Sequence, residues 1–81
     1  MSRTVLKSVF SGAVYHKRIA MGLTQEEVAE AISTSVRWYQ RIEKGQVLPS
    51  FLVGLRLIVL LNLDVNQLLK VVKVYVPFHT H

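Results

Sequence analysis

The sequence predicts an all-α domain of five helices that ends in a short C-terminal β-strand. The chain of 81 residues has room for one small core. Its 51% hydrophobic and 19% charged residues are typical of a packed globule, and apolar residues recur at helical spacing through most of the chain. We therefore expect a helical domain over residues 1–70 and a strand-like tail over residues 71–81.

The first helix is expected over residues 5–21, where the gaps between apolar residues fit one face of a helix. Gly22 ends it, because glycine readily takes the left-handed conformation that follows many helices. The second helix begins at Gln25, since the Thr24 hydroxyl can cap it while the Glu27 carboxylate reaches back to the Thr24 amide. It should end before the small hydroxyl residues at positions 33–35.

Those hydroxyl residues predict a tight turn, and the last of them, Ser35, is placed to cap a third helix over residues 36–44. Gly45 ends this helix. A fourth helix is expected over residues 51–61 after a cap at Ser50, with Asn62 as a left-handed exit. Asp64, followed three residues later by Gln67, predicts the start of a fifth helix that reaches residues 69–71.

The tail changes its hydrophobic period. Apolar residues alternate with others from Val72 to Phe78, and this alternation of β-branched and aromatic residues is typical of a strand. Pro77 restricts the strand to an edge, and a single strand is not stable alone. We therefore expect it to pair with the tail of a second chain. The last residues, including His79 and His81, are better explained as a frayed terminus than as a metal site.

The charge and composition of the chain narrow the classes of function. A net charge of +5 favours a polyanionic partner, although charge alone does not separate DNA, RNA and anionic lipid. The absence of cysteine excludes disulfides, thiolate metal sites and cysteine nucleophiles. No nucleophile with a base, metal-ligand cluster or glycine-rich phosphate loop stands out, so we expect neither an enzyme nor a bound cofactor or metal.

Two segments have some features of membrane or export signals. The apolar segment at residues 51–63 is shorter than the roughly 20 residues that a membrane-spanning helix needs. The N-terminal segment lacks the continuous apolar run of a signal peptide. We therefore expect a cytoplasmic protein without a membrane partner.

A short helix, a three-residue turn and a second short helix form the helix-turn-helix plan of DNA-binding proteins, here over residues 24–44. The segment from Gly22 to Glu30, followed by Ser35, by Arg41 to Gly45 and by Pro49 with Ser50, resembles the xenobiotic-response-element (XRE) family. This family includes the lambda and 434 repressors and Cro. The resemblance extends over residues 17–69 and implies a lambda-repressor-like domain whose helix at residues 36–44 enters the major groove.

The resemblance also implies roles for individual residues. Base edges would be read by Val36, Arg37 and Arg41. An arginine can donate two hydrogen bonds to guanine, and valine can touch a thymine methyl group. Phosphate-facing positions match Lys17, Gln25, Ser35, Trp38, Gln40 and Lys44. Arg18 and Glu43 match an ion pair that ties the first helix to the third.

Some of these assignments have alternatives, and the turn departs from the family pattern. Arg37, Arg41 and Lys44 could instead form the solvated face of an ordinary helix. The Trp38 ring lies between the inward and outward faces, so it can pack in the core or contact a phosphate or sugar. Ser33 stands where the family usually has glycine, and serine takes a left-handed conformation only at some cost.

The second half of the chain has more apolar residues than one small domain needs. The expected core positions of the fourth helix are Phe51, Leu55, Ile58 and Leu61, and a second apolar stripe lies beside them. A helix that is apolar nearly all round must be covered on both sides, so we expect a second copy to cover this one. The residues expected to form the dimer are Leu52, Val53, Val59, Leu60, Val72, Val74, Val76 and Phe78.

Together, charge and resemblance predict a sequence-specific DNA-binding transcriptional regulator. It would act as a repressor, binding a partly palindromic operator in double-stranded DNA as a homodimer. The alternative is a DNA-binding antitoxin or a restriction-modification controller, in which the apolar second half binds a partner protein such as a toxin.

Overall fold

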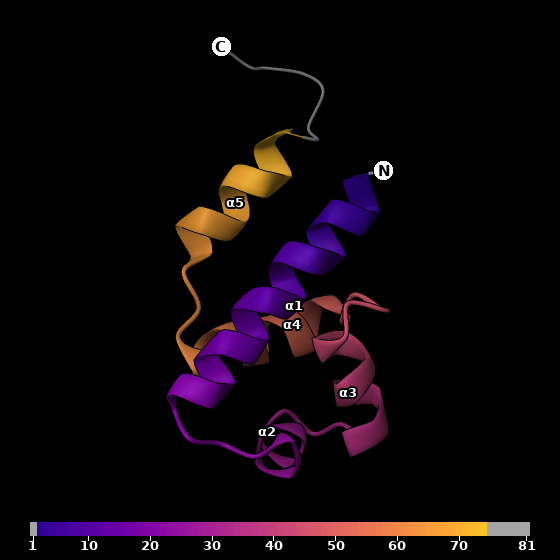
Figure 1. Ribbon diagram of the computed structural model, residues 1–81, viewed down its shortest axis with the longest axis vertical. Coiled ribbons are helices and arrows are strands. Elements are labelled where there is room, and N and C mark those ends of the chain that lie inside the picture. The colour runs from indigo at the N-terminus through magenta and orange to yellow at the C-terminus, as the bar shows by residue number, and fades with distance from the viewer. Residues whose placement is uncertain (1, 75–81) are drawn as a thin grey trace.

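The computed structural model describes residues 2–74, and five α-helices lie within them (Figure 1). They are α1 (Ser2–Ala20), α2 (Gln25–Ala31), α3 (Val36–Glu43), α4 (Phe51–Leu61) and α5 (Val65–Val74). The predicted order of five helices is confirmed. Helix α1 packs against α3, α4 and α5, while α2 packs against α3. The long first helix is therefore the support on which the α2–α3 pair is held.

The predicted C-terminal strand is wrong over its first part. Val72 and Val74 lie in α5, which continues to Val74. The physical reason is packing, because Leu68 and Val72, one helical turn apart, line the same apolar hollow as Leu6 of α1. This packing outweighs the local β-propensity of the valines. Val76 and Phe78 belong to residues 75–81, which lie outside the described part of the chain.

Local hydrogen bonds begin four of the helices where the sequence predicts. The capping box of α2 is confirmed: the Glu27 amide donates to the Thr24 hydroxyl over 3.0 Å, and the Thr24 amide donates to the Glu27 carboxylate over 2.8 Å. Side-chain oxygens accept an amide three residues ahead at the starts of α3, α4 and α5 as well, in Ser35, Ser50 and Asp64. Because each bond spans only three residues, these starts follow from local sequence alone.

A left-handed residue follows each of the helices α1 to α4. Gly22 has φ 69° and Gly45 has φ 75°, as their positions predict, and Asn62 has φ 51° after α4. Ser33, in the turn between α2 and α3, has φ 61°. Serine therefore takes the conformation that is usual for glycine at this place, and it bears the steric cost of a Cβ atom there.

We expect Ser33→Gly to raise the free energy of unfolding by about 0.5–1 kcal/mol. A left-handed conformation costs a residue with a Cβ roughly 1–2 kcal/mol, and the greater freedom of glycine in the unfolded chain offsets part of the gain. Urea denaturation measures the change. The matched control is Gly22→Ala, because no atom lies within 4 Å of an added Cβ at that left-handed position. It should lose about 1 kcal/mol through the backbone alone. An unchanged or lower stability of Ser33→Gly would contradict the strain.

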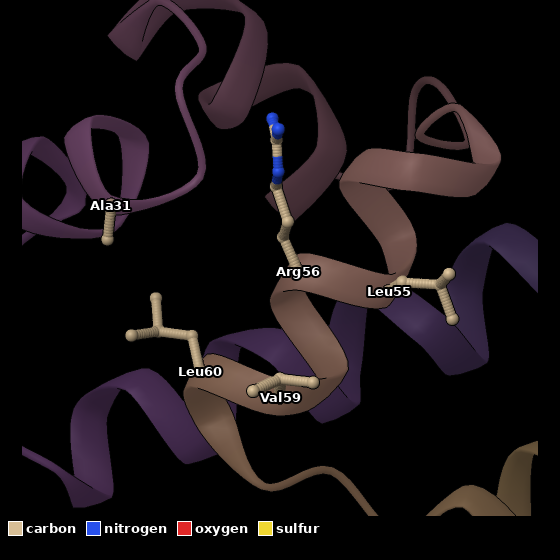
Figure 2. A pocket seen from close by; sticks show the side chains of 5 residues that line it. All are labelled: Ala31, Leu55, Arg56, Val59 and Leu60. Carbon is tan, nitrogen blue, oxygen red and sulfur yellow. The ribbon is translucent and has the colours of Figure 1, made fainter.

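Helix α4 buries part of the expected stripe, Ile58 and Leu61, but not Phe51 and Leu55. Leu57 and Leu61 are fully buried, and Ile58 packs beside them. Phe51 is 82% exposed and Leu55 42% exposed, so neither is a core residue. Figure 2 shows Arg56 directed toward α2 and α3. Leu55 lies at the edge of the apolar hollow that Leu6, Phe10 and Leu68 also line. In a helix that is apolar nearly all round, periodicity does not choose the buried side, and the neighbouring helices decide it.

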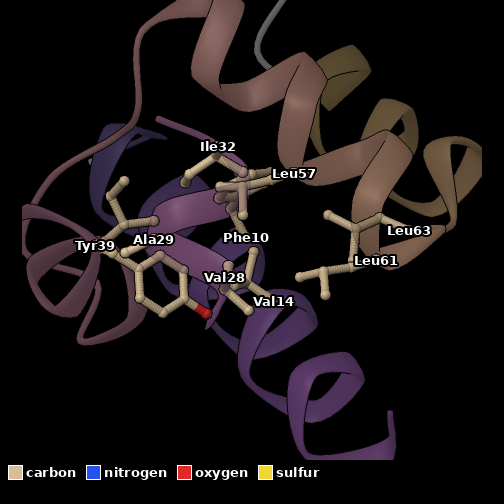
Figure 3. Packing of buried hydrophobic residues seen from close by; sticks show 10 residues of the cluster. Phe10, Val14, Val28, Ala29, Ile32, Tyr39, Leu57, Leu61 and Leu63 are labelled. Atoms are coloured by element: carbon tan, nitrogen blue, oxygen red, sulfur yellow. The ribbon is translucent and has the colours of Figure 1, made fainter. Parts of the chain in front are cut away.

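The core joins side chains from α1 to α4 (Figure 3). Tyr39 and Ile42 of α3 are fully or almost fully buried in it, which turns the opposite face of α3 outward. The cluster consists of Phe10, Val14, Val28, Ala29, Ile32, Tyr39, Ile42, Leu57, Leu61 and Leu63.

Candidate nucleic-acid interface

The outward face of α3 carries the basic residues of the motif. Arg37 and Arg41 are exposed, as is Lys44 directly after the helix. Val36, at the first position of α3, is half-buried and packs against the core, so only part of its side chain is accessible. The structure thus brings Arg37, Arg41 and part of Val36 to one surface at the start and middle of α3.

The opposite side of α3 is held by a buried carboxylate. Glu43 accepts two hydrogen bonds from the Arg18 guanidinium of α1, from Nε to Oε2 over 2.7 Å and from Nη2 to Oε1 over 2.9 Å. Tyr39 donates its hydroxyl proton to the same carboxylate. The Arg18 side chain is 11% exposed and that of Glu43 6%, so little water screens the ion pair. The pair joins α1 to the end of α3.

Gln25 extends this network to the start of α2. Its Nε2 donates to Glu43 Oε1 over 2.9 Å, and its Oε1 accepts a hydrogen bond from Gln40 Nε2 over 3.0 Å. One N–H of the Gln25 amide is engaged by Glu43, so the second is available to an acceptor from outside. We refer to Arg18, Gln25, Tyr39, Gln40 and Glu43 as the Glu43 network.

Opposing effects set the protonation of the network. Burial raises the pKa of Glu43, but hydrogen bonds from Arg18, Tyr39 and Gln25 outweigh it, so the net pKa lies below its ordinary value. Burial and the hydrogen bond to Glu43 raise the pKa of Tyr39. The hydrogen bond to Glu43 also raises the pKa of Arg18. At neutral pH the network therefore holds a carboxylate, a guanidinium and a protonated tyrosine.

The other candidate phosphate contacts occupy varied surroundings. The Ser35 hydroxyl oxygen accepts the Trp38 amide over 3.1 Å, which leaves its own proton free to donate. Lys17 is half-buried in the last turn of α1. Trp38 is 37% exposed, and its ring centroid lies 5.2 Å from the Arg41 guanidinium carbon. Its ring is therefore partly accessible and contacts a basic side chain.

Sequence reasoning missed two side chains that support the motif. Tyr39 lies four residues before Glu43, and this spacing places both on one face of α3. Arg56 of α4 donates from Nη1 to the Ile32 carbonyl over 3.2 Å. A cation at this position satisfies a carbonyl at the end of α2. No local signal indicates this second contact, because it joins residues far apart in the chain.

Metal sites and membrane-spanning helices were also sought among the residues that the structure describes, 2–74. Within residues 2–74 no group of three or more His, Cys, Asp or Glu side chains is placed to hold a metal ion. In the same part of the chain, no helix combines the length and apolar character needed to cross a membrane.

Comparison with known proteins agrees with this geometry. A family model described as a helix-turn-helix domain matches residues 10–70, from α1 through the α2–α3 pair into α5. No curated protein and no solved structure gives a significant match to the chain. The family match covers well over half of the chain and contains the whole Glu43 network. The chain therefore belongs to the family of DNA-binding helix-turn-helix domains.

Proposed function

We propose that the protein is a sequence-specific transcriptional regulator of the XRE type, and that it inserts α3 into the major groove of DNA. One observation carries this proposal: α3 turns Arg37 and Arg41 outward while the buried Glu43 network fixes its inner side to α1 and α2. A helix held in this way can enter the groove without changing its position in the domain. Little binding free energy is therefore spent on ordering the helix.

In this proposal the contacts divide into two classes. Arg37 and Arg41 read guanine through two hydrogen bonds each, and the accessible part of Val36 touches a thymine methyl group. Phosphate contacts position the domain without reading sequence. We assign that role to Lys17, Gln25, Ser35, Trp38, Gln40 and Lys44.

The operator and the oligomer are linked by symmetry. A homodimer with a two-fold axis presents two α3 helices to half-sites about 34 Å apart, one turn of duplex, so the site is partly palindromic. We propose that occupation of such a site by the dimer excludes the transcription machinery. We therefore propose that the regulator acts as a repressor.

Selection from random duplex DNA with purified protein, followed by a salt titration on the selected site, tests the function. We expect a partly palindromic consensus. The affinity should fall steeply with salt, because each neutralised phosphate releases counterions. Equal affinity for all duplexes would contradict a sequence-specific regulator.

The surface proposed for the dimer lies on α4. Phe51, Leu52, Leu55 and Val59 are exposed there, and Leu60 faces Ala31 across a shallow hollow (Figure 2). Val53 and Leu60 are half-buried, while Val72 of α5 is exposed. A second copy that covers this surface would remove apolar area from water, which is favourable in proportion to that area.

We expect Val59→Glu to weaken the dimer at least tenfold and the operator affinity with it. Val59 is 80% exposed, so the change should leave the fold of one protomer intact, while a buried unpaired carboxylate in a dimer is costly. Sedimentation equilibrium measures the dissociation constant. Ala20→Glu, at an exposed site at the end of α1, is the charge-matched control. If the unmodified protein is monomeric at tens of micromolar, the dimer is wrong and the alternative, in which this surface binds a toxin-like partner protein, is favoured.

A further inference from the structure

Trp38 and Arg41 form a contact on the exposed face of α3. They lie three residues apart, so they are neighbours on the helix surface, and the guanidinium carbon is 5.2 Å from the centre of the ring. This distance is within the range of a cation–π interaction. Within residues 2–74, no hydrogen bond or ion pair of the Arg41 guanidinium is present, so the ring is the contact that orients it.

A contact with the face of an aromatic ring can leave the hydrogen-bonding edge of a guanidinium free. A ring that stacks on a guanidinium uses its flat face, whereas the N–H groups that recognise guanine project from its edge in the same plane. Trp38 can therefore restrict the long Arg41 side chain without occupying its donors. A restricted side chain loses less conformational entropy when it binds.

Trp38 is itself held in place. Its backbone amide donates to the Ser35 hydroxyl oxygen in the capped first turn of α3, and the residue as a whole is 37% exposed. Trp38 is thus not a core residue, although more than half of its surface is covered. It stands on the capped first turn of the helix, one turn before Arg41.

We propose that Trp38 is a specificity-determining positioning residue, whose indole ring orients Arg41 for the base that Arg41 reads. This inference rests on the proposed function and deepens it. It adds a third role to the two that the sequence left open for Trp38, packing in the core and contact with a phosphate or sugar.

The first test needs no DNA. Trp38 is the single tryptophan of the chain, so the tryptophan fluorescence of the free protein reports on this ring alone. Arg41→Ala should change the emission, and Arg37→Ala, which alters another exposed arginine of α3, should leave it unchanged. An emission that is the same in Arg41→Ala and the unmodified protein would show that the contact is not formed in solution, and would overturn the proposal.

The second test measures base preference at each position of the selected site. Trp38→Leu should lose about two- to fivefold in affinity, the range expected for an exposed cation–π pair. The loss of preference should fall at the position that Arg41→Ala affects, and not at the one that Arg37→Ala affects. Trp38→Phe should retain most of the affinity and most of the base preference at that position. Adding Trp38→Leu to Arg41→Ala should cause no further loss of preference at that position.

Other outcomes of the binding measurements would contradict the proposed role of Trp38. A Trp38→Leu protein that binds all sequences more weakly by the same factor, with the Arg41-dependent preference intact, would show that the ring contacts only phosphate or sugar. Circular dichroism on each variant establishes that the helices remain folded. Equal affinity of the unmodified protein for all duplexes would reject the proposed function and this role with it. The fluorescence result in the free protein would still show separately whether the ring and the guanidinium meet.

Discussion

Glu43→Ala should lower the free energy of unfolding by about 3–5 kcal/mol, the range expected when one partner of a buried ion pair is removed. The variant leaves the Arg18 guanidinium buried without its carboxylate and removes the acceptor of the Tyr39 and Gln25 hydrogen bonds. For a chain of 81 residues this is a large part of the total stability. Thermal and urea unfolding measure the loss. Glu30→Ala, at an exposed position of α2, should change stability by less than about 0.5 kcal/mol.

A double-mutant cycle separates the pair from its surroundings. Arg18→Ala alone should also destabilise, because it leaves the Glu43 carboxylate buried and unpaired. Arg18→Ala with Glu43→Ala should cost less than the sum of the two single losses, since neither charge then remains alone. Strictly additive losses would reject an energetic coupling between the two side chains.

The same pair makes stability depend on pH. Because the pKa of Glu43 is lowered by folding, its contribution is fully present above the ordinary pKa of a glutamate and is lost as the pH falls through the lower value in the folded protein. We expect the melting temperature to decline as the pH is lowered below about 4. In Glu43→Gln this part of the decline should be absent. An equal acid dependence in both proteins would contradict the lowered pKa.

Arg37→Ala and Arg41→Ala should each lose about 1–3 kcal/mol of binding free energy on the selected operator and relax base preference at one position of each half-site. The reason is geometric. The two arginines lie four residues apart on the exposed face of α3, so they reach neighbouring bases from the same side. Binding measurements on a set of single-base variants of the operator give both quantities.

Gln25→Ala and Lys44→Ala are the contrasting variants. A residue that contacts phosphate positions the protein without reading bases, so these variants should bind all sequences more weakly by a similar factor. Lys44→Ala should also reduce the slope of the salt dependence by about one. A uniform loss in the two arginine variants, with the fold intact, would show that α3 does not read the sequence.

Local sequence was sufficient wherever an interaction spans only a few residues. The Thr24–Glu27 capping box and the serine caps of α3 and α4 are made by bonds across three residues. The same is true of the left-handed residues, where Gly22 and Gly45 mark helix ends by their own backbone freedom. These signals are independent of what the helices pack against.

The candidate site could be predicted only in part. Residue type and spacing indicated an exposed basic face on α3. Arg18 and Glu43 are 25 positions apart, so local spacing cannot predict that they pair. Family resemblance implied the pair instead. The Tyr39 hydroxyl and the Arg56 contact with the Ile32 carbonyl were not predicted. A contact between residues that are far apart in the chain produces no pattern in the local sequence around either residue.

By itself, the sequence determined the helical class, the starts of α2 to α5 and the helix-turn-helix spacing, because capping bonds and glycine conformation act within one turn of chain. Only the tertiary structure decided that α4 buries Leu57 instead of Leu55 and that residues 72–74 continue a helix instead of a strand. It also gathered the Glu43 network from three helices. In each case several local solutions have similar free energy, and the choice among them is made by the surface against which the segment packs.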